Sequence, residues 1–302
     1  MFELWIPITI AAAFLQNVRS ALQKHLKGQL STTGATFTRF VYAVPVAFIY
    51  VWFLNQYLDL PLPTPNGEFA IFGAIGGVAQ ITATALLVYL FSLRNFTVGT
   101  TYSKTETVQA AIFGVVILGD TLSTGALIAI LVSLGGVMVL SVAKGATDAR
   151  SLLTSWTQKS ALIGLASGAA FGISAVSYRA ASLSLGDGHF LIRAGFTLAC
   201  VTVLQTLIMT VYMSLREPGE FSRVIKAWRV AGLVGVAGAL GSMGWFTAMT
   251  IQNAAYVRAL GQIELVFTFI VSAVIFKETT NRTEFGGILM VVGGIFILLL
   301  WA

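Results

Sequence analysis

Two clusters of ionisable and amide side chains lie within otherwise apolar segments of the sequence. Their members are Lys104, Glu106 and Gln109 in the first cluster and Arg258, Gln262 and Glu264 in the second. A carboxylate in such a setting could bind a coupling proton or the ammonium group of a substrate, whereas a neighbouring cation would favour a substrate carboxylate. The spacing of three places Glu106 and Gln109 on one helix face, and the spacing of four does the same for Arg258 and Gln262.

The four charges of these clusters admit two interpretations. A charged side chain in a membrane helix costs about 2.5 to 3.5 kcal/mol on insertion scales, so it usually faces a cavity or a partner. The alternative is a position in the first helical turn, where the charge snorkels to the interface or complements the helix dipole. Both interpretations stay open for Lys104 and Arg258, which lie within a turn of the predicted helix starts. Glu106 and Glu264 lie deeper, and we expect them to line a central cavity.

A third group of polar side chains marks the first apolar segment. Gln16, Arg19, Ser20 and Gln23 follow one helical stripe, and Asn17 lies next to it. A polar stripe on a membrane helix lines a polar cavity or a contact with another helix. We expect Gln16 and Asn17 to face the cavity, and Arg19 and Gln23 to be solvated near the cytoplasmic loop.

The sequence shows no arrangement typical of catalysis or of a metal or cofactor site. His25 and His189 are isolated in predicted loops, and Cys200 is the single cysteine, so neither a metal cluster nor a disulfide within one chain is expected. No glycine-rich phosphate loop is present. We therefore expect a protein that is not an enzyme and that carries no cofactor.

The composition indicates a membrane protein with several spans. The 302 residues are 57% hydrophobic and 10% charged, with a mean hydropathy of +0.86, where soluble domains carry about 25% charged residues. The net charge of +6 comes from basic residues scattered over predicted loops. Such scattering is typical of topology signals, so we expect the lipid bilayer as a partner and no nucleic acid.

Apolar segments of about 17 to 25 residues are long enough to cross the hydrocarbon core. We therefore predict an all-α protein with ten transmembrane helices, at residues 3–23, 35–56, 69–91, 102–119, 124–143, 160–181, 190–213, 229–250, 258–276 and 284–302.

The second half of the chain repeats the first. Residues 95–140 align without a gap on residues 253–298, which places Glu106 on Glu264. The prediction is a first repeat at 1–143, a linker at 144–159 and a second repeat at 160–302. Five helices in each repeat make the two copies enter the membrane in opposite senses, so we expect an inverted repeat whose halves meet near the midplane.

Lysine and arginine residues are concentrated on the side of the odd-numbered loops. The positive-inside rule assigns that side to the cytoplasm and both termini to the opposite side.

Two motifs at equivalent positions resemble the EamA domain pair of the drug/metabolite transporter superfamily. They are Val115-Val116-Ile117-Leu118-Gly119-Asp120 with Gly135-Gly136, and Val274-Ile275-Phe276-Lys277-Glu278 with Gly286-Gly287 and Gly293-Gly294. The resemblance implies a ten-helix secondary transporter, often an exporter of amino acids, other metabolites or toxic compounds. Members more usually keep both termini in the cytoplasm, contrary to the charge count here. Members also often have proline early in helices 4 and 9, where this chain has Thr105-Glu106 and Ile263-Glu264.

The sequence therefore predicts a secondary active transporter of a small metabolite, such as an amino acid, a related polar compound or a drug-like compound. We expect alternating access, export rather than import, and protons as candidate coupling ions, in the inner membrane of a bacterium. A homodimer would be compatible with this function. Two alternatives stay open: a non-transporting membrane scaffold or receptor subunit, and an intramembrane enzyme acting on lipid-linked substrates.

Overall fold

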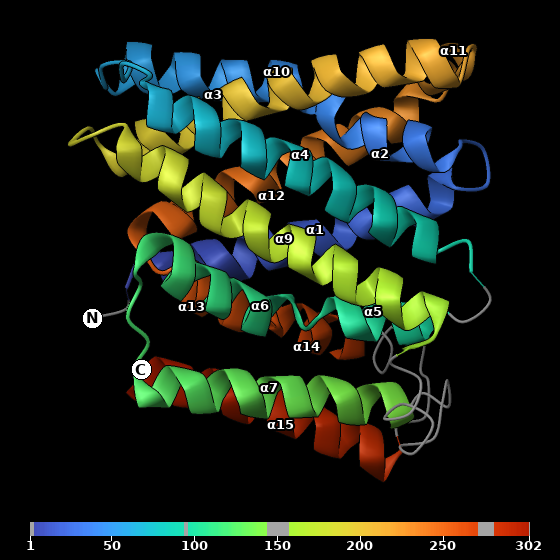
Figure 1. Ribbon diagram of the computed structural model, residues 1–302, viewed down its shortest axis with the longest axis vertical. Helices are drawn as coiled ribbons and strands as arrows, with labels where there is room; N and C mark the ends of the chain where they lie inside the picture. The colour runs from blue at the N-terminus through green and yellow to red at the C-terminus, as the bar shows by residue number, and fades with distance from the viewer. Residues whose placement is uncertain (1–2, 94–95, 144–156, 271–280, 302) are drawn as a thin grey trace.

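The computed structural model describes residues 3–93, 96–143, 157–270 and 281–301. These residues form helices joined by short connections, and no strand occurs among them. The helices lie side by side in stacked layers, with their axes running between the same two ends of the molecule (Figure 1). The expected all-α class is confirmed.

The first half contains α1 (Trp5–Leu26), α2 (Thr32–Val41), α3 (Ala43–Tyr57), α4 (Gly67–Leu90), α5 (Phe96–Ser103), α6 (Glu106–Phe113), the π-helix η1 (Gly114–Leu118) and α7 (Thr124–Ala143). The second half contains α9 (Lys159–Ser184), α10 (Phe190–Arg216), α11 (Glu220–Lys226), α12 (Trp228–Ile251), α13 (Ala254–Gly261), α14 (Ile263–Ile270) and α15 (Arg282–Trp301).

Seven stretches among the described residues are long and apolar enough to cross a membrane. They are Thr32–Tyr57, Gly67–Leu90, Thr124–Val142, Lys159–Ser184, Phe190–Arg216, Trp228–Ile251 and Arg282–Trp301. The α1 helix, which has 22 residues, is not among these stretches; it carries the polar stripe of the first segment. The chain is thus an integral, multi-pass membrane protein.

Two predicted spans differ from the structure in the same way. The span predicted at 102–119 begins earlier, at Phe96, and is interrupted between Ser103 and Glu106. The span predicted at 258–276 begins at Ala254 and is interrupted at Gln262, and its residues 271–276 lie outside the described part. A window that averages hydropathy does not register such breaks. The two interruptions lie 158 residues apart, as the repeat requires.

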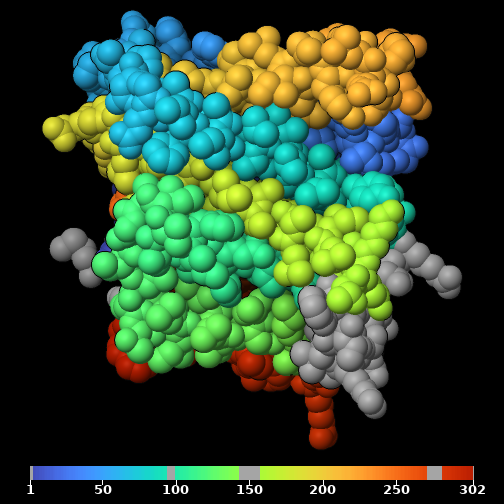
Figure 2. All heavy atoms as spheres, viewed as in Figure 1, coloured from blue at the N-terminus to red at the C-terminus, as the bar shows by residue number. Residues whose placement is uncertain are grey.

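The last helices of the two halves pack against each other along one edge of the molecule (Figure 1). A Cβ atom added to Gly136 of α7 would lie 2.7 Å from the carbonyl oxygen of Gly287 on α15, and one added to Gly294 would lie 2.8 Å from the carbonyl oxygen of Ala129. The residue numbers rise along one helix as they fall along the other, so α7 and α15 are antiparallel. Side chains fill most of the space between α7 and the neighbouring α6 on the visible face (Figure 2).

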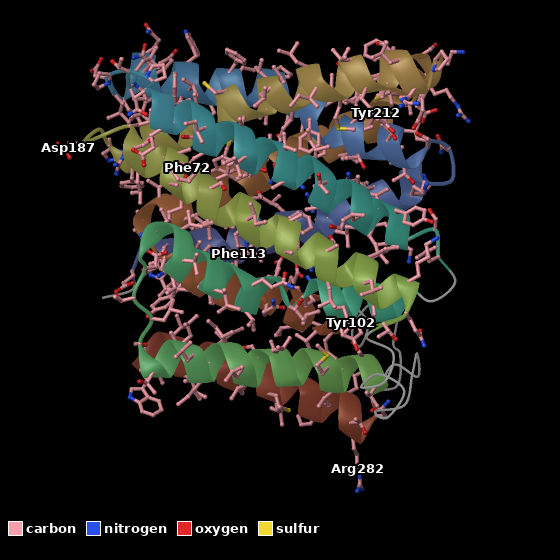
Figure 3. All side chains as sticks on the ribbon, in the orientation of Figure 1. Phe72, Tyr102, Phe113, Asp187, Tyr212 and Arg282 are labelled. Atoms are coloured by element: carbon pink, nitrogen blue, oxygen red, sulfur yellow. The ribbon has the colours of Figure 1, made fainter. Side chains whose placement is uncertain are left out.

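The two ends of the bundle are distinct. Both termini and Asp187 lie at one end, which we call the terminal end (Figures 1 and 3). Arg282, which begins α15, lies at the opposite end, where α1 finishes with Lys24 and His25 in its last turn (Figure 3). We call this the basic end.

Candidate functional site

A cavity of about 520 Å³ lies between α1, the two interrupted helices and the α7–α15 pair. Its polar lining comes from Gln16, Asn17, Arg19, Ser20, Lys24, Thr100, Thr101, Ser103, Lys104, Glu106, Ser141, Arg258, Glu264, Thr268 and Glu284. Its apolar lining comes from Leu87, Phe91, Val137, Leu140, Phe171, Leu265, Phe269 and Ile288. The volume is typical of a pocket for a small organic molecule.

Glu264 is held by three residues from two parts of the chain. Its carboxylate forms an ion pair with Lys104, which lies in the break between α5 and α6. Gln16 Nε2 donates a hydrogen bond to Glu264 Oε2 at 3.0 Å, and Asn17 Nδ2 donates to the Glu264 carbonyl oxygen at 2.9 Å. The carboxylate at the start of α14 is therefore fixed by α1 and by the break in the other half.

In the second ion pair the cation comes from the second half and the carboxylate from the first half. Arg258 Nη1 on α13 lies 3.6 Å from Glu106 Oε1 at the start of α6, and both side chains are almost fully buried. The Arg258 guanidinium also lies over the Trp245 ring, 4.7 Å from its centroid, in cation–π geometry. In each pair a cation of one half binds the carboxylate of the other half.

Six of the eight side chains predicted for the site line the cavity: Gln16, Asn17, Lys104, Glu106, Arg258 and Glu264. The other two are not among its lining residues. Gln262 donates to Thr107 Oγ1 at 2.8 Å, and Gln109 Nε2 points toward the Leu165 carbonyl oxygen at 3.5 Å. These two amides connect helices instead.

Glu106 and Glu264 lie in the first turns of α6 and α14, directly after the breaks, whereas the two cations do not occupy the first turns of their segments. Because α5 begins at Phe96 and α13 at Ala254, Lys104 and Arg258 each lie more than one turn beyond the helix start. Arg258 is only 7% exposed. Arg258 thus lies in the last turn of α13, beside the break, and its role in the cavity stays a prediction.

Arg19 and Gln23 are buried rather than solvated, contrary to the expectation from sequence. Their exposed fractions are 3% and 2%. Gln23 Nε2 donates to the Ala35 carbonyl oxygen of α2 at 2.9 Å, and Gly238 of α12 packs against the Arg19 side chain. The α2 helix follows directly after the first loop, but α12 comes from a distant part of the sequence, so the distance of Arg19 from the first loop was a poor guide to its burial.

The terminal end contains a different set of polar contacts, of which one joins the two halves. Arg179 Nη1 on α9 donates to the carbonyl oxygens of Met249 and Gln252 at the end of α12, both at 2.6 Å. Arg179 Nε lies 3.9 Å from Asp120 Oδ1, just after η1. None of these residues lines the cavity, so the contacts pack the bundle on the side away from it.

Comparisons with known proteins agree with this architecture. The model of the EamA-like transporter family matches the chain twice, at residues 3–142 and 158–300. A solved structure titled "Crystal structure of protein" is similar over 99% of this chain and 96% of its own, with 14% sequence identity and a TM-score of 0.70; at this identity the likeness concerns the fold alone. No curated protein matches the sequence.

Proposed function

The chain belongs to the EamA-like transporter family, and on that premise we propose that it is a secondary transporter of a small metabolite that works by alternating access. One observation carries the proposal. Two ion pairs that join the halves lie beside the breaks of equivalent helices and line one cavity.

Ten membrane segments in two inverted repeats fit the helices described. Seven stretches qualify by length and composition, and α1, the α5–α6 pair and the α13–α14 pair would supply the other three. The α7 and α15 helices occupy equivalent places 158 residues apart, and they are antiparallel. Repeats of five passes each would have this relation, so we propose repeats at 1–143 and 160–302.

Interrupted helices are a feature of binding sites in secondary transporters, because a break exposes backbone groups that can bind a substrate or ion. Here both breaks adjoin the cavity, with Lys104 in one and Glu264 just after the other. Rocking of one half against the other would have to rearrange both ion pairs. We propose this rearrangement as the transport step.

Proton exchange at Glu106 or Glu264 would couple transport to a pH gradient. A proton on either carboxylate cancels the charge that its partner in the other half binds, and so it weakens the contact between the halves. The same carboxylates would then join the two halves when ionised and let them separate when protonated. Neither carboxylate needs to touch the substrate for this role.

We propose export from a bacterial cytoplasm, with which the position of the cavity is compatible. Lys24, Phe91 and Glu284 line it and lie near the basic ends of α1, α4 and α15. The positive-inside rule assigns this end to the cytoplasm. A cavity that reaches the basic end would load substrate there and release it at the terminal end.

The test is transport by purified protein in proteoliposomes. Vesicles are loaded with amino acids, nucleosides, organic cations and organic anions, and the loss of each compound is followed with and without a pH gradient. We expect loss of one compound class, stimulated by the gradient. Glu106→Gln and Glu264→Gln should each reduce the gradient-dependent rate at least tenfold.

Asp187→Asn is the matched control, since Asp187 is an exposed carboxylate at the terminal end. It should transport at the wild-type rate. If both glutamine variants also transport normally, the ion pairs are not part of the transport step.

A further inference from the structure

Arg19 on α1 is a buried cation that has no carboxylate partner within the described part of the chain. It is 3% exposed, and it forms none of the ion pairs found among the described residues. Within the ranges that the structure describes, its Nε atom has no hydrogen-bond partner, and its Nη2 atom donates to the neighbouring Ser20 Oγ alone, at 3.3 Å. Arginine keeps its proton in proteins, so this charge cannot be removed by titration. Burying it unpaired is costly.

The surroundings of Arg19 increase the excess of positive charge. Arg39 on α2 packs against the same residue of α12, Gly238, from which a Cβ atom would lie 3.4 Å from Arg39 Cγ and 3.5 Å from Arg19 Cδ. Arg39 is also buried, and its Nη1 donates to the neutral Thr84 Oγ1. Two guanidinium groups therefore share this region.

The two carboxylates in the middle of the cavity are already engaged. Glu264 binds Lys104 and Gln16, and Glu106 binds Arg258. A substrate ammonium group would have to displace one of these cations. An anionic group would instead meet a guanidinium that has free bonding capacity.

The cavity joins Arg19 to an apolar wall. Leu87, Phe171, Leu265 and Ile288 line the same 520 Å³ space as Arg19. A ligand that fills it needs an apolar body as well as one charged group.

We propose that the cavity takes a small organic anion with an apolar body, whose carboxylate binds the Arg19 guanidinium. The inference names the substrate class of the proposed transporter and rests on that function. Gln16 and Ser20 lie on the same stripe of α1 and line the same cavity, so they can donate further hydrogen bonds. The body would lie against Phe171 and the apolar residues of α7 and α15.

The experiment measures binding without transport, so that it can fail independently of the transport assay. Purified protein in detergent micelles is dialysed against radiolabelled phenylacetate and indole-3-acetate. The amide and amine of each acid, which keep the same body, serve as competitors. We expect the acids to bind at least tenfold more tightly than their amides and amines.

Variants at position 19 test the assigned residue. Arg19→Gln should weaken binding of the acids about ten- to a hundredfold, the loss expected for one hydrogen-bonded ion pair. Arg19→Lys keeps the charge and should retain part of the affinity, and Arg216→Gln, at the exposed end of α10, should bind as the wild type does.

Three results would overturn the proposal: equal or tighter binding of the amides or amines, unchanged binding of the acids by Arg19→Gln, or no binding of any probe. The comparison of acids with amides uses the wild-type protein, so it stands even if Arg19→Gln does not fold. A transporter that exports amines but not acids would refute this inference and leave the proposed function intact.

Discussion

Removal of the Glu106 carboxylate should destabilise the fold by about 2 to 4 kcal/mol. At the observed separation of 3.6 Å, the attraction between two unit charges is about 4 to 5 kcal/mol for an effective dielectric constant of about 20. Glu106→Gln loses this attraction but avoids the cost of burying the carboxylate. Losing one partner of a buried pair typically costs about 3 to 5 kcal/mol.

The structure places this variant toward the lower part of that range. Arg258 keeps its contact with the Trp245 ring, and a cation–π contact of this kind retains about 0.5 to 2 kcal/mol. The amide that Glu106→Gln introduces can also still accept a hydrogen bond from the guanidinium through its oxygen. The remaining loss should appear as a lower free energy of unfolding.

The assay is a double-mutant cycle on protein in detergent micelles, unfolded with denaturant and followed by far-UV circular dichroism. Glu106→Gln, Arg258→Gln and the double variant are compared with the wild type. Since each single variant leaves one buried partner unpaired, the double variant should lose about 1 to 3 kcal/mol less than the sum of the singles. Asp187→Asn, at an exposed loop position, should change the free energy by less than about 0.5 kcal/mol.

A loss below about 0.5 kcal/mol for Glu106→Gln would refute the reasoning. So would strict additivity in the double variant, because additivity would mean that the two charges do not interact. Either result would mean that this ion pair does not contribute to the free energy of unfolding.

Two further variants test the packing of the bundle, the first between the halves and the second within the second half. Gly136→Ala should lower the free energy of unfolding, measured by thermal denaturation, by about 1 to 3 kcal/mol, because its Cβ would lie 2.7 Å from the carbonyl oxygen of Gly287. The control Gly293→Ala, whose Cβ meets open space, should leave the free energy of unfolding unchanged or raise it by about 0.5 to 1 kcal/mol. Equal effects of the two variants would contradict the close approach of α7 and α15. Arg179→Gln should lower the free energy of unfolding by about 2 to 5 kcal/mol, since the Arg179 Nη1 donates to two carbonyl groups at the end of α12. Arg216→Gln is the exposed control, and a change for Arg179→Gln as small as for this control would show that these bonds do not stabilise the terminal end.

The repeat could be predicted from sequence because it rests on rare residues at one fixed spacing. Glu106 and Glu264 align at 158 positions, and the structure starts α7 and α15, and also α5 and α13, at the same spacing. The helices could be predicted from apolar segments of sufficient length, because burial in lipid requires a hydrophobic composition over a fixed length.

The breaks and the pairing of charges could not be predicted in this way. A break costs a few backbone hydrogen bonds, which hydropathy does not measure. The sequence signal for the first break was the hydroxyl-rich stretch Thr100-Thr101-Tyr102-Ser103-Lys104-Thr105, because serine and threonine hydroxyls compete with the helix for hydrogen bonds to backbone groups. Which cation meets which carboxylate depends on how the halves dock. The burial of Arg19 depends on α2 and α12, which no pattern within α1 reveals.

The central claim, that the cavity opens alternately to the two sides of the membrane, is tested most directly by labelling a cysteine inside it. In a Cys200→Ser background, Leu265→Cys places one thiol in the cavity lining, and Asp187→Cys provides an exposed reference at the terminal end. A membrane-impermeant maleimide is applied to oriented vesicles from either side, at rest and during transport. We predict that the thiol at position 265 reacts from the basic end at rest and from both ends during transport, while the reference reacts from the terminal end alone. Labelling of position 265 from one side only, at rest and during transport, would contradict alternating access.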